Sequence, residues 1–175
     1  KIGRWMLHKE RLRFVVYSGL ALIGLFLMAS PKASAQADLV PGVTLRSYLL
    51  DIEPTKIPLL VASQTPNIDE VRGTVDFDSD SLPSLGGSTY STVTGFLSIE
   101  TKADYQFRLT SDDGSRLFIG GNNVCDHDGR HGANPKIGST VSLTEGKHAF
   151  LIEHFDSGGN KSLLLEWRQS NAGKW

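Results

Sequence analysis

Residues 105–119 read YQFRLTSDDGSRLFI, and this stretch decides the fold. Its apolar residues Tyr105, Phe107 and Leu109 alternate with polar ones, which is the period-two pattern of a half-buried strand. The pattern predicts a strand over 104–110. After the first three dozen residues no window sustains a helical period over three turns. The sequence therefore predicts an all-β fold.

Further strands are predicted downstream. Apolar residues 117–119 are followed by GGNN at 120–123, whose residues tolerate positive φ and favour a hairpin turn. Residues 148–154 and 163–167 carry apolar side chains on both faces, which predicts two central strands. The SGGN segment at 157–160 joins these two strands.

The region 52–87 has a different composition, because it is rich in proline and aspartate. Proline cannot donate to a strand ladder, so regular pairing is expected to be sparse and the connections to be long and exposed. The residues concerned are Pro54, Pro58, Pro66, Pro83, Asp76, Asp78 and Asp80. Short strands with one long irregular excursion fit an antiparallel β-sandwich or jelly roll better than a meander barrel.

The first 37 residues are predicted to form a signal-peptide helix. Basic residues precede the apolar run 14–29, which is followed by Pro31 and small residues, and this order is typical of export signals. Cleavage is expected after Ala35 or Ala37. The basic residues are Lys9, Arg11 and Arg13. The predicted location is therefore secreted, periplasmic or at the cell surface.

A retained membrane-spanning helix is the alternative for this segment. The apolar run is shorter than the roughly 20 residues that a bilayer needs, and Ser18, Gly19 and Gly24 interrupt it. Membrane contact is thus expected only before cleavage. Met6 would start a signal of ordinary length, so 1–5 is a possible upstream extension, and 38–175 is expected to form one domain at the front of a longer protein.

The charge of the chain argues against a nucleic-acid partner. Residues 1–35 hold six basic residues and one acidic residue, which leaves 18 − 6 = 12 basic and 19 − 1 = 18 acidic residues, a net charge of −6. A chain of this sign lacks the basic footprint that phosphate backbones require. The single cysteine, Cys125, excludes an intrachain disulfide and is predicted to be a buried apolar residue, with a reactive thiol as the alternative.

The candidate site residues are the aspartates and histidines of SDDG at 111–114 and DHDGRH at 126–131. Aspartates beside glycine can be turn formers only, and this alternative stays open beside a metal or sugar site. Adjacent residues of a strand point to opposite faces, so Asp112 and Asp113 can share one ion only if the backbone turns sharply or is cis. Oxygen ligands favour calcium over zinc, and Gly129 makes a helical zinc pair of His127 and His131 improbable.

These motifs resemble the protective-antigen (PA-fourteen) domain family. The resemblance rests on residues 105–119, on VCDHDGRHG at 124–132, on LTEGKH at 143–148 and on LLLEW at 163–167. It spans about 41–168 and implies a β-sandwich, commonly a carbohydrate-binding insert or appendage of bacterial toxins, glycosidases, yeast adhesins and large secreted bacterial proteins.

The resemblance also implies a site. In lectin members of the family a cis-linked aspartate pair and a later loop hold a calcium ion that contacts sugar hydroxyls, and the pair corresponds to Asp112 and Asp113. The expected calcium ligands are therefore Asp112 and Asp113. The wider glycan or polysaccharide site is expected to add Asp126, Asp128 and His131, with the segment 129–136 as a candidate for the later loop.

Two other functions were weighed against a non-catalytic glycan-binding module. Catalysis is disfavoured because about 140 residues leave no embellishment for a cleft, and nucleophile, phosphate-loop and dinucleotide motifs are missing from the sequence. A structural or docking domain that heads a larger secreted glycosidase or oxidoreductase, with a catalytic domain downstream in the same chain, stays open. Aromatic residues that could stack on a sugar are expected at Tyr90, Phe155 and Trp175, whereas Trp167 is expected in the core.

Overall fold

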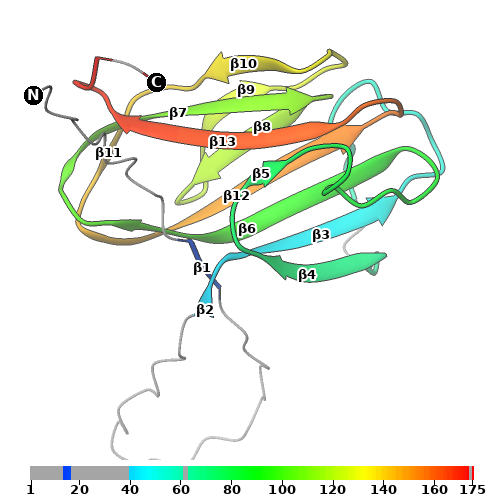
Figure 1. The fold of residues 1–175 in the computed structure, drawn as a ribbon, viewed down its shortest axis with the longest axis horizontal. Helices are drawn as coiled ribbons and strands as arrows, with labels where there is room; N and C mark the ends of the chain where they lie inside the picture. The colour runs from blue at the N-terminus through cyan, green and yellow to red at the C-terminus, as the bar shows by residue number, and fades with distance from the viewer. Residues whose placement is uncertain (1–13, 17–39, 61–62, 174) are drawn as a thin grey trace, which may run out of the picture.

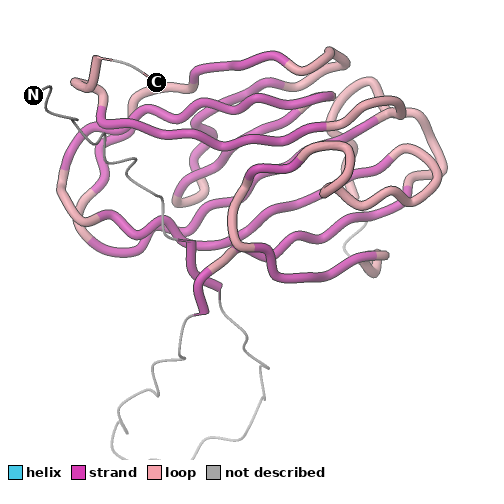
Figure 2. Tube along the Cα trace, viewed as in Figure 1, coloured by secondary structure: helices cyan, strands magenta, loops and turns pink. Residues whose placement is uncertain are grey.

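The computed structural model describes residues 14–16, 40–60, 63–173 and 175, which form two antiparallel sheets packed as a β-sandwich (Figure 1). Strands and loops account for all of this part, as Figure 2 shows. Among these residues there is consequently no helix with the length and apolar character to cross a membrane. The predicted all-β sandwich is confirmed.

The larger sheet has eight strands, and β6 and β12 lie at its centre. Its hydrogen-bonded path runs β2 (Val40–Pro41), β1 (Phe14–Val16), β6 (Thr89–Ile99), β12 (Gly146–Asp156), β8 (Ser115–Ile119) and β9 (Asn122–His127). Two further strands, β3 (Val43–Leu49) and β4 (Ile68–Arg72), extend it beside β6. The β12 strand pairs with β6 over all of its eleven residues and with β8 over Phe150–His154.

The smaller sheet has five strands arranged around β7 and β13. Its path runs β10 (Asn134–Ile137), β7 (Ala103–Asp112), β13 (Ser162–Gln169) and β5 (Asp76–Phe77), with β11 (Val141–Leu143) paired to the other end of β7. The β12–β13 connection therefore passes from one sheet to the other. Both strands are interior to their sheets, as the sequence predicts.

The core lies between the two sheets and is built by alternation along the strands. In β7 every second residue is buried, including Phe107 and Leu109, and the intervening polar residues stay partly exposed. The opposite sheet contributes Leu117 and Ile152 to the same cluster. Trp167 packs against this cluster from its edge, in agreement with its predicted core position.

The predicted turn after β8 is shorter than the GGNN segment. Gly120 and Gly121 have φ of 57° and 82°, values that favour glycine, whereas Asn122 already pairs with Ile119 as the first residue of β9. The β6 strand has no counterpart among the predicted strands. Gly95 interrupts its apolar side, and a Cβ at this position would lie 3.0 Å from Cε1 of Phe150.

Most of the predicted signal-peptide helix, residues 1–37, lies outside the described residues. The three described residues, Phe14–Val16, form strand β1, so the prediction of helix is wrong for them. These residues form a strand because part of the edge of β6 is available to pair with them. The β3 strand pairs with β6 only over Thr89–Thr94, and β1 pairs with the next stretch of that edge, at Phe96 and Leu97.

Matched leucine substitutions test the position of the core. Leu109→Ala is expected to lower the free energy of unfolding by about 2–5 kcal/mol, since Leu109 is fully buried. Leu59→Ala is expected to change it by less than about 0.5 kcal/mol, because Leu59 is fully exposed. Urea unfolding followed by tryptophan fluorescence measures both. Equal losses in the two variants would contradict this assignment of the core.

Candidate functional site

The predicted site residues lie where several loops meet at one end of the sandwich, at the right of Figure 1. Asp112 is the last residue of β7 and Asp113 begins the β7–β8 turn, and the connection from β9 to β10 carries Asp128 and His131. The β12–β13 connection, residues 157–161, reaches the same end. Hydrogen bonds described below join all three loops.

The Asp113 side chain is the centre of this loop cluster. It is buried, and its Oδ2 accepts hydrogen bonds from the backbone N–H of Ser157 at 2.9 Å and from the Ser157 hydroxyl at 2.7 Å. Its Oδ1 accepts the N–H of His131 at 3.1 Å. The peptide bond between Asp112 and Asp113 is cis, one of the two arrangements that would let both side chains share an ion. Asp113 thus ties the β9–β10 and β12–β13 connections to the end of β7.

Asp156 is a third carboxylate at this end of the molecule. It is the last residue of β12, is buried, and its Oδ1 accepts the N–H of Gly158 at 3.0 Å. Burial raises the pKa of Asp156, and the negative charges of Asp113 and Asp112 raise it further. Burial, followed by the charge of Asp113, also raises the pKa of Asp112. The aspartate pair thus opposes the ionisation of Asp156, while the positive charge of Lys161 favours it.

Asp126 and Asp128 face one cation, Arg116 of β8. Nη2 of Arg116 donates to Oδ2 of Asp128 at 2.7 Å, and its Nε lies 3.3 Å from Oδ2 of Asp126 without hydrogen-bond alignment. Oδ1 of Asp128 accepts the N–H groups of Ile57 at 2.7 Å and Gly129 at 2.8 Å. Asp128 is thus held by three donors and fastens the loop after β3 to β8.

His131 meets the aspartate pair through its backbone, while its ring lies against His127. The two rings stack with centroids 4.0 Å apart. Nε2 of His131 lies 3.1 Å from the His127 carbonyl oxygen, and Nε2 of His127 lies 3.2 Å from that of Asn134. Burial, followed by the charge of His131, lowers the pKa of His127. Nε2 of each ring is thus engaged by a backbone carbonyl oxygen.

Three contributors to the loop cluster were not predicted from the sequence: His154, Asp156 and Ser157. His154 is buried in β12, with Nε2 2.9 Å from the carbonyl oxygen of Asp112. A signal for Asp156 is present in the sequence, because this carboxylate directly follows an apolar strand and precedes Ser-Gly-Gly-Asn. The contacts of His154 and Ser157 depend on strands far apart in the chain, which no local pattern reveals.

Two of the three aromatic residues predicted to stack on sugars are buried. Tyr90 and Phe155 are 5% and 0% exposed, and the Tyr90 hydroxyl donates to Glu153 at 2.8 Å, so the prediction of exposure is wrong for both. Cys125 is buried, as predicted, and burial raises the pKa of its thiol to about 11. Trp175 is partly exposed, and its ring packs against two guanidinium groups, those of Arg108 and Arg168, at 4.7 and 4.5 Å.

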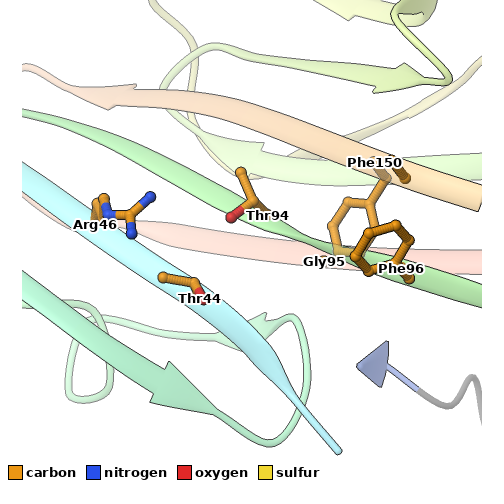
Figure 3. A pocket seen from close by; sticks show the side chains of 7 residues that line it. Thr44, Arg46, Thr94, Gly95, Phe96 and Phe150 are labelled. Carbon is orange, nitrogen blue, oxygen red and sulfur yellow. The ribbon is translucent and has the colours of Figure 1, made fainter. Parts of the chain in front are cut away.

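A shallow surface hollow of about 320 Å³ lies elsewhere, over β3, β6 and β12 (Figure 3). Phe150, one of its lining residues, is six positions from Asp156 along β12, or about 20 Å at roughly 3.3 Å per residue. The other lining residues are Thr44, Arg46, Thr94, Gly95, Phe96 and Ala149. The hollow is therefore separate from the loop cluster.

The metal-binding capacity of the loop cluster rests on oxygen atoms. Within the described ranges no group of three or more His, Cys, Asp or Glu side chains is arranged to hold a metal ion. Carbonyl and hydroxyl oxygens of the adjoining loops are the other protein donors available to a hard cation. Such a cation would also neutralise the negative charges of Asp112, Asp113 and Asp156. Because the available donors are oxygen atoms, they fit calcium better than zinc.

Comparisons with known proteins agree with this fold. A PA14 domain from an RTX adhesin, described as sugar-binding, is 23% identical with a TM-score of 0.68, over 75% of this chain and 92% of that chain. The PA14 domain of the MpAFP antifreeze protein is 16% identical with a TM-score of 0.68, over 83% and 90%. A β-glucosidase from Kluyveromyces marxianus is 12% identical with a TM-score of 0.62, over 81% of this chain and 18% of that chain.

A search of curated protein sequences finds no match for the chain. The family model of the PA14 domain, in contrast, matches residues 40–174, which includes every strand of the sandwich except β1. The chain therefore belongs to the PA14 domain family.

Proposed function

We propose that this PA14 domain is a non-catalytic carbohydrate-binding module and that calcium assists its binding of glycans. The observation that carries the proposal is the buried carboxylate of Asp113 at the loop end of the sandwich, which follows Asp112 in the chain and accepts hydrogen bonds from Ser157, the residue after Asp156. Membership of the PA14 family adds support, since a neighbour of similar fold is described as sugar-binding.

Asp112 and Asp113 would hold the calcium ion, with oxygens of the β12–β13 connection completing the set. Asp156, the last residue of β12 and directly before that connection, is a further candidate because its carboxylate is buried and the charges of the aspartate pair act on it. Carboxylate and carbonyl oxygens are the ligands that calcium prefers. When bound, the ion would supply a positive charge that coordinates sugar hydroxyl oxygens.

The remaining predicted site residues are given supporting roles. Asp126 and Asp128 both face Arg116, and Asp128 anchors the loop after β3 through Ile57. The N–H of His131 fixes one oxygen of Asp113. We therefore place Asp126, Asp128 and His131 in the framework of the glycan site, where they position its loops.

The domain is further proposed to act outside the cell, secreted or on the surface. Support comes from the order of basic, apolar and small residues in the first 37 positions and from the adhesin and antifreeze proteins among its structural neighbours. The glycan partner would then be an extracellular or cell-surface polysaccharide.

A docking domain without a ligand of its own is the second candidate function. The observation that favours it is the similarity to part of a β-glucosidase, of which the matching region covers 18%. In such an arrangement the sandwich would accompany a catalytic domain in the same chain. Binding to glycans by the isolated chain separates the two candidates, because a pure docking domain would bind none.

A glycan array tests the calcium-assisted binding. The wild-type chain is expected to bind a subset of glycans in calcium and to lose at least about tenfold in affinity in chelator, about 1.4 kcal/mol. Asp113→Asn is expected to show the same loss in the presence of calcium, because the amide removes the charge and replaces with a donor one of the two oxygens that accept hydrogen bonds from Ser157 and His131.

Asp104→Asn is the matched control, since Asp104 lies at the opposite end of β7 and its contact to the Ser142 hydroxyl needs only an acceptor oxygen. It is expected to bind like the wild type. Equal binding in calcium and chelator would refute the metal mechanism, and failure to bind any glycan would favour the docking function.

The raised pKa of Asp156 predicts how its replacement depends on pH. The folded protein holds this proton more tightly than the unfolded chain, so ionisation of Asp156 costs stability as pH rises from its ordinary pKa of 3.8 through the raised value. Asp156→Asn keeps an acceptor for Gly158 and removes that cost. In chelator, the stability of the variant relative to the wild type is expected to be higher at pH 7 than at pH 4, as measured by urea unfolding. A difference independent of pH would contradict the prediction.

The same variant is also informative in calcium. A ligand that binds only the folded state raises its stability by about 2.7 kcal/mol at 100 times Kd. If Asp156 belongs to the calcium site, Asp156→Asn is expected to gain less from a fixed calcium concentration than the wild type does. An equal gain in stability for the variant and the wild type would show that Asp156 is not a calcium ligand.

A further inference from the structure

We infer that His154 is a positioning residue, which holds the backbone between Asp112 and Asp113 in place for ligand binding. This inference rests on the proposed function. His154 contacts the aspartate pair from inside the sandwich, whereas Ser157 and His131 contact it from the loops.

The imidazole of His154 belongs to a central strand of the larger sheet. In β12, His154 pairs with Ser91 of β6 on one side and with Ser115 of β8 on the other. Its side chain is 1% exposed, and Nε2 lies 2.9 Å from the carbonyl oxygen of Asp112. Its position is thus fixed by two strand ladders and by the surrounding core.

The contact with the Asp112 carbonyl determines which ring nitrogen of His154 carries the hydrogen. A carbonyl oxygen can only accept, so Nε2 must carry the hydrogen. Because the ring is buried, a charged imidazolium is disfavoured, so Nδ1 carries no proton. Among the described residues Nδ1 has no hydrogen-bond partner. The ring therefore directs its single N–H at Asp112.

The Asp112 carbonyl belongs to the peptide unit that links the two aspartates. Because a peptide unit is planar, a hydrogen bond to its oxygen fixes the plane and with it the directions in which both side chains leave the backbone. The carboxylate of Asp113 is restrained separately by Ser157 and His131. A buried hydrogen bond between the Ser111 and Ser115 hydroxyls, 2.7 Å long, braces the turn beneath. Together these contacts arrange the pair before any ligand arrives.

A role in core packing alone does not explain why a histidine stands at position 154. An aliphatic side chain would fill the same volume without burying an unpartnered nitrogen, which disfavours folding. What the imidazole adds is a donor at Nε2, aimed at the backbone of the aspartate pair. Residues that orient metal ligands from behind typically change metal affinity by roughly 10- to 100-fold when they are replaced.

Two amide variants separate positioning from packing. In His154→Gln the amide nitrogen stands as many bonds from Cα as Nε2 does, so a donor can still reach Asp112. In His154→Asn the amide nitrogen stands where Nδ1 does and falls short. Calcium alone, titrated into the full chain by calorimetry, is the probe. His154→Asn is expected to raise the Kd at least about tenfold, and His154→Gln is expected to stay within about threefold of the wild type.

Urea unfolding in chelator accompanies each titration and reports folding separately from binding. Equal calcium affinity in the wild type and His154→Asn would overturn the inference while leaving the proposed calcium site intact. Loss of affinity in both variants in proportion to their loss of stability would also overturn it, in favour of packing. A wild type that binds no calcium would refute the metal mechanism itself, and the positioning role with it.

Should His154→Asn fail to fold, the wild type supplies the decisive measurement by nitrogen-15 NMR. The His154 ring is expected to show a protonated Nε2 whose hydrogen exchanges slowly with solvent and whose resonance shifts when calcium is added. His148, at the other end of β12, is the internal control. A His154 N–H that exchanges as fast as that of His148, or does not respond to calcium, would overturn the inference.

Discussion

The pairing of β12 with β6 over eleven residues is the constraint on which the rest of the structure depends. It places β12 at the centre of the larger sheet, and β8 then pairs with its other edge. Because the register is continuous to Asp156, the last residues of the strand arrive at the loop end in fixed positions. The N–H of Phe155 donates to the carbonyl of Gly114 at 3.0 Å, which ties this end of β12 to the turn that follows the aspartate pair. The site is therefore an extension of the sheet geometry.

At the loop end, carboxylates that repel one another are held by uncharged hydrogen-bond donors. Backbone N–H groups and a serine hydroxyl satisfy Asp113, and a carbonyl oxygen occupies the N–H of His154. None of these partners carries a compensating positive charge, whereas Asp126 and Asp128 share Arg116. The molecule thus separates its carboxylates into a pair that faces Arg116 and a group in which dipoles hold Asp113. In the second group burial raises the pKa of Asp156, and the positive charge of Lys161 only partly offsets this.

The fold could be predicted from the sequence where the alternation is local. The Tyr105, Phe107 and Leu109 pattern corresponds to β7, and the apolar run at 163–167 corresponds to β13. The β6 strand was not predicted because Gly95 replaces an apolar residue on its core-facing side, and that glycine is explained only by the Phe150 ring of the neighbouring strand. The helix expected over 14–16 is replaced by pairing to an edge that only the tertiary structure creates.

The sequence indicated where the candidate site lies, at the β7–β8 turn. Calcium and glycan binding at this site remain predictions. Aspartates beside glycine stand out in a chain, and their location at a strand end followed from the alternation before them. Phe155 and Tyr90 were misplaced because their burial depends on which face of a central strand they occupy. The contribution of His154 could not be foreseen, since 42 residues separate it from Asp112.

The β12–β13 connection crosses from one sheet to the other, and this has a consequence for how such a domain can diversify. Its residues 157–161 contribute to the loop end while the flanking ladders lie outside it. Insertions or exchanges in a surface loop disturb stability far less than changes in a ladder. Natural variation, or grafting in the laboratory, can therefore alter the chemistry presented at this end while the same sandwich is retained. The strands can stay the same while this connection varies, because residues 157–161 lie outside the ladders of β12 and β13.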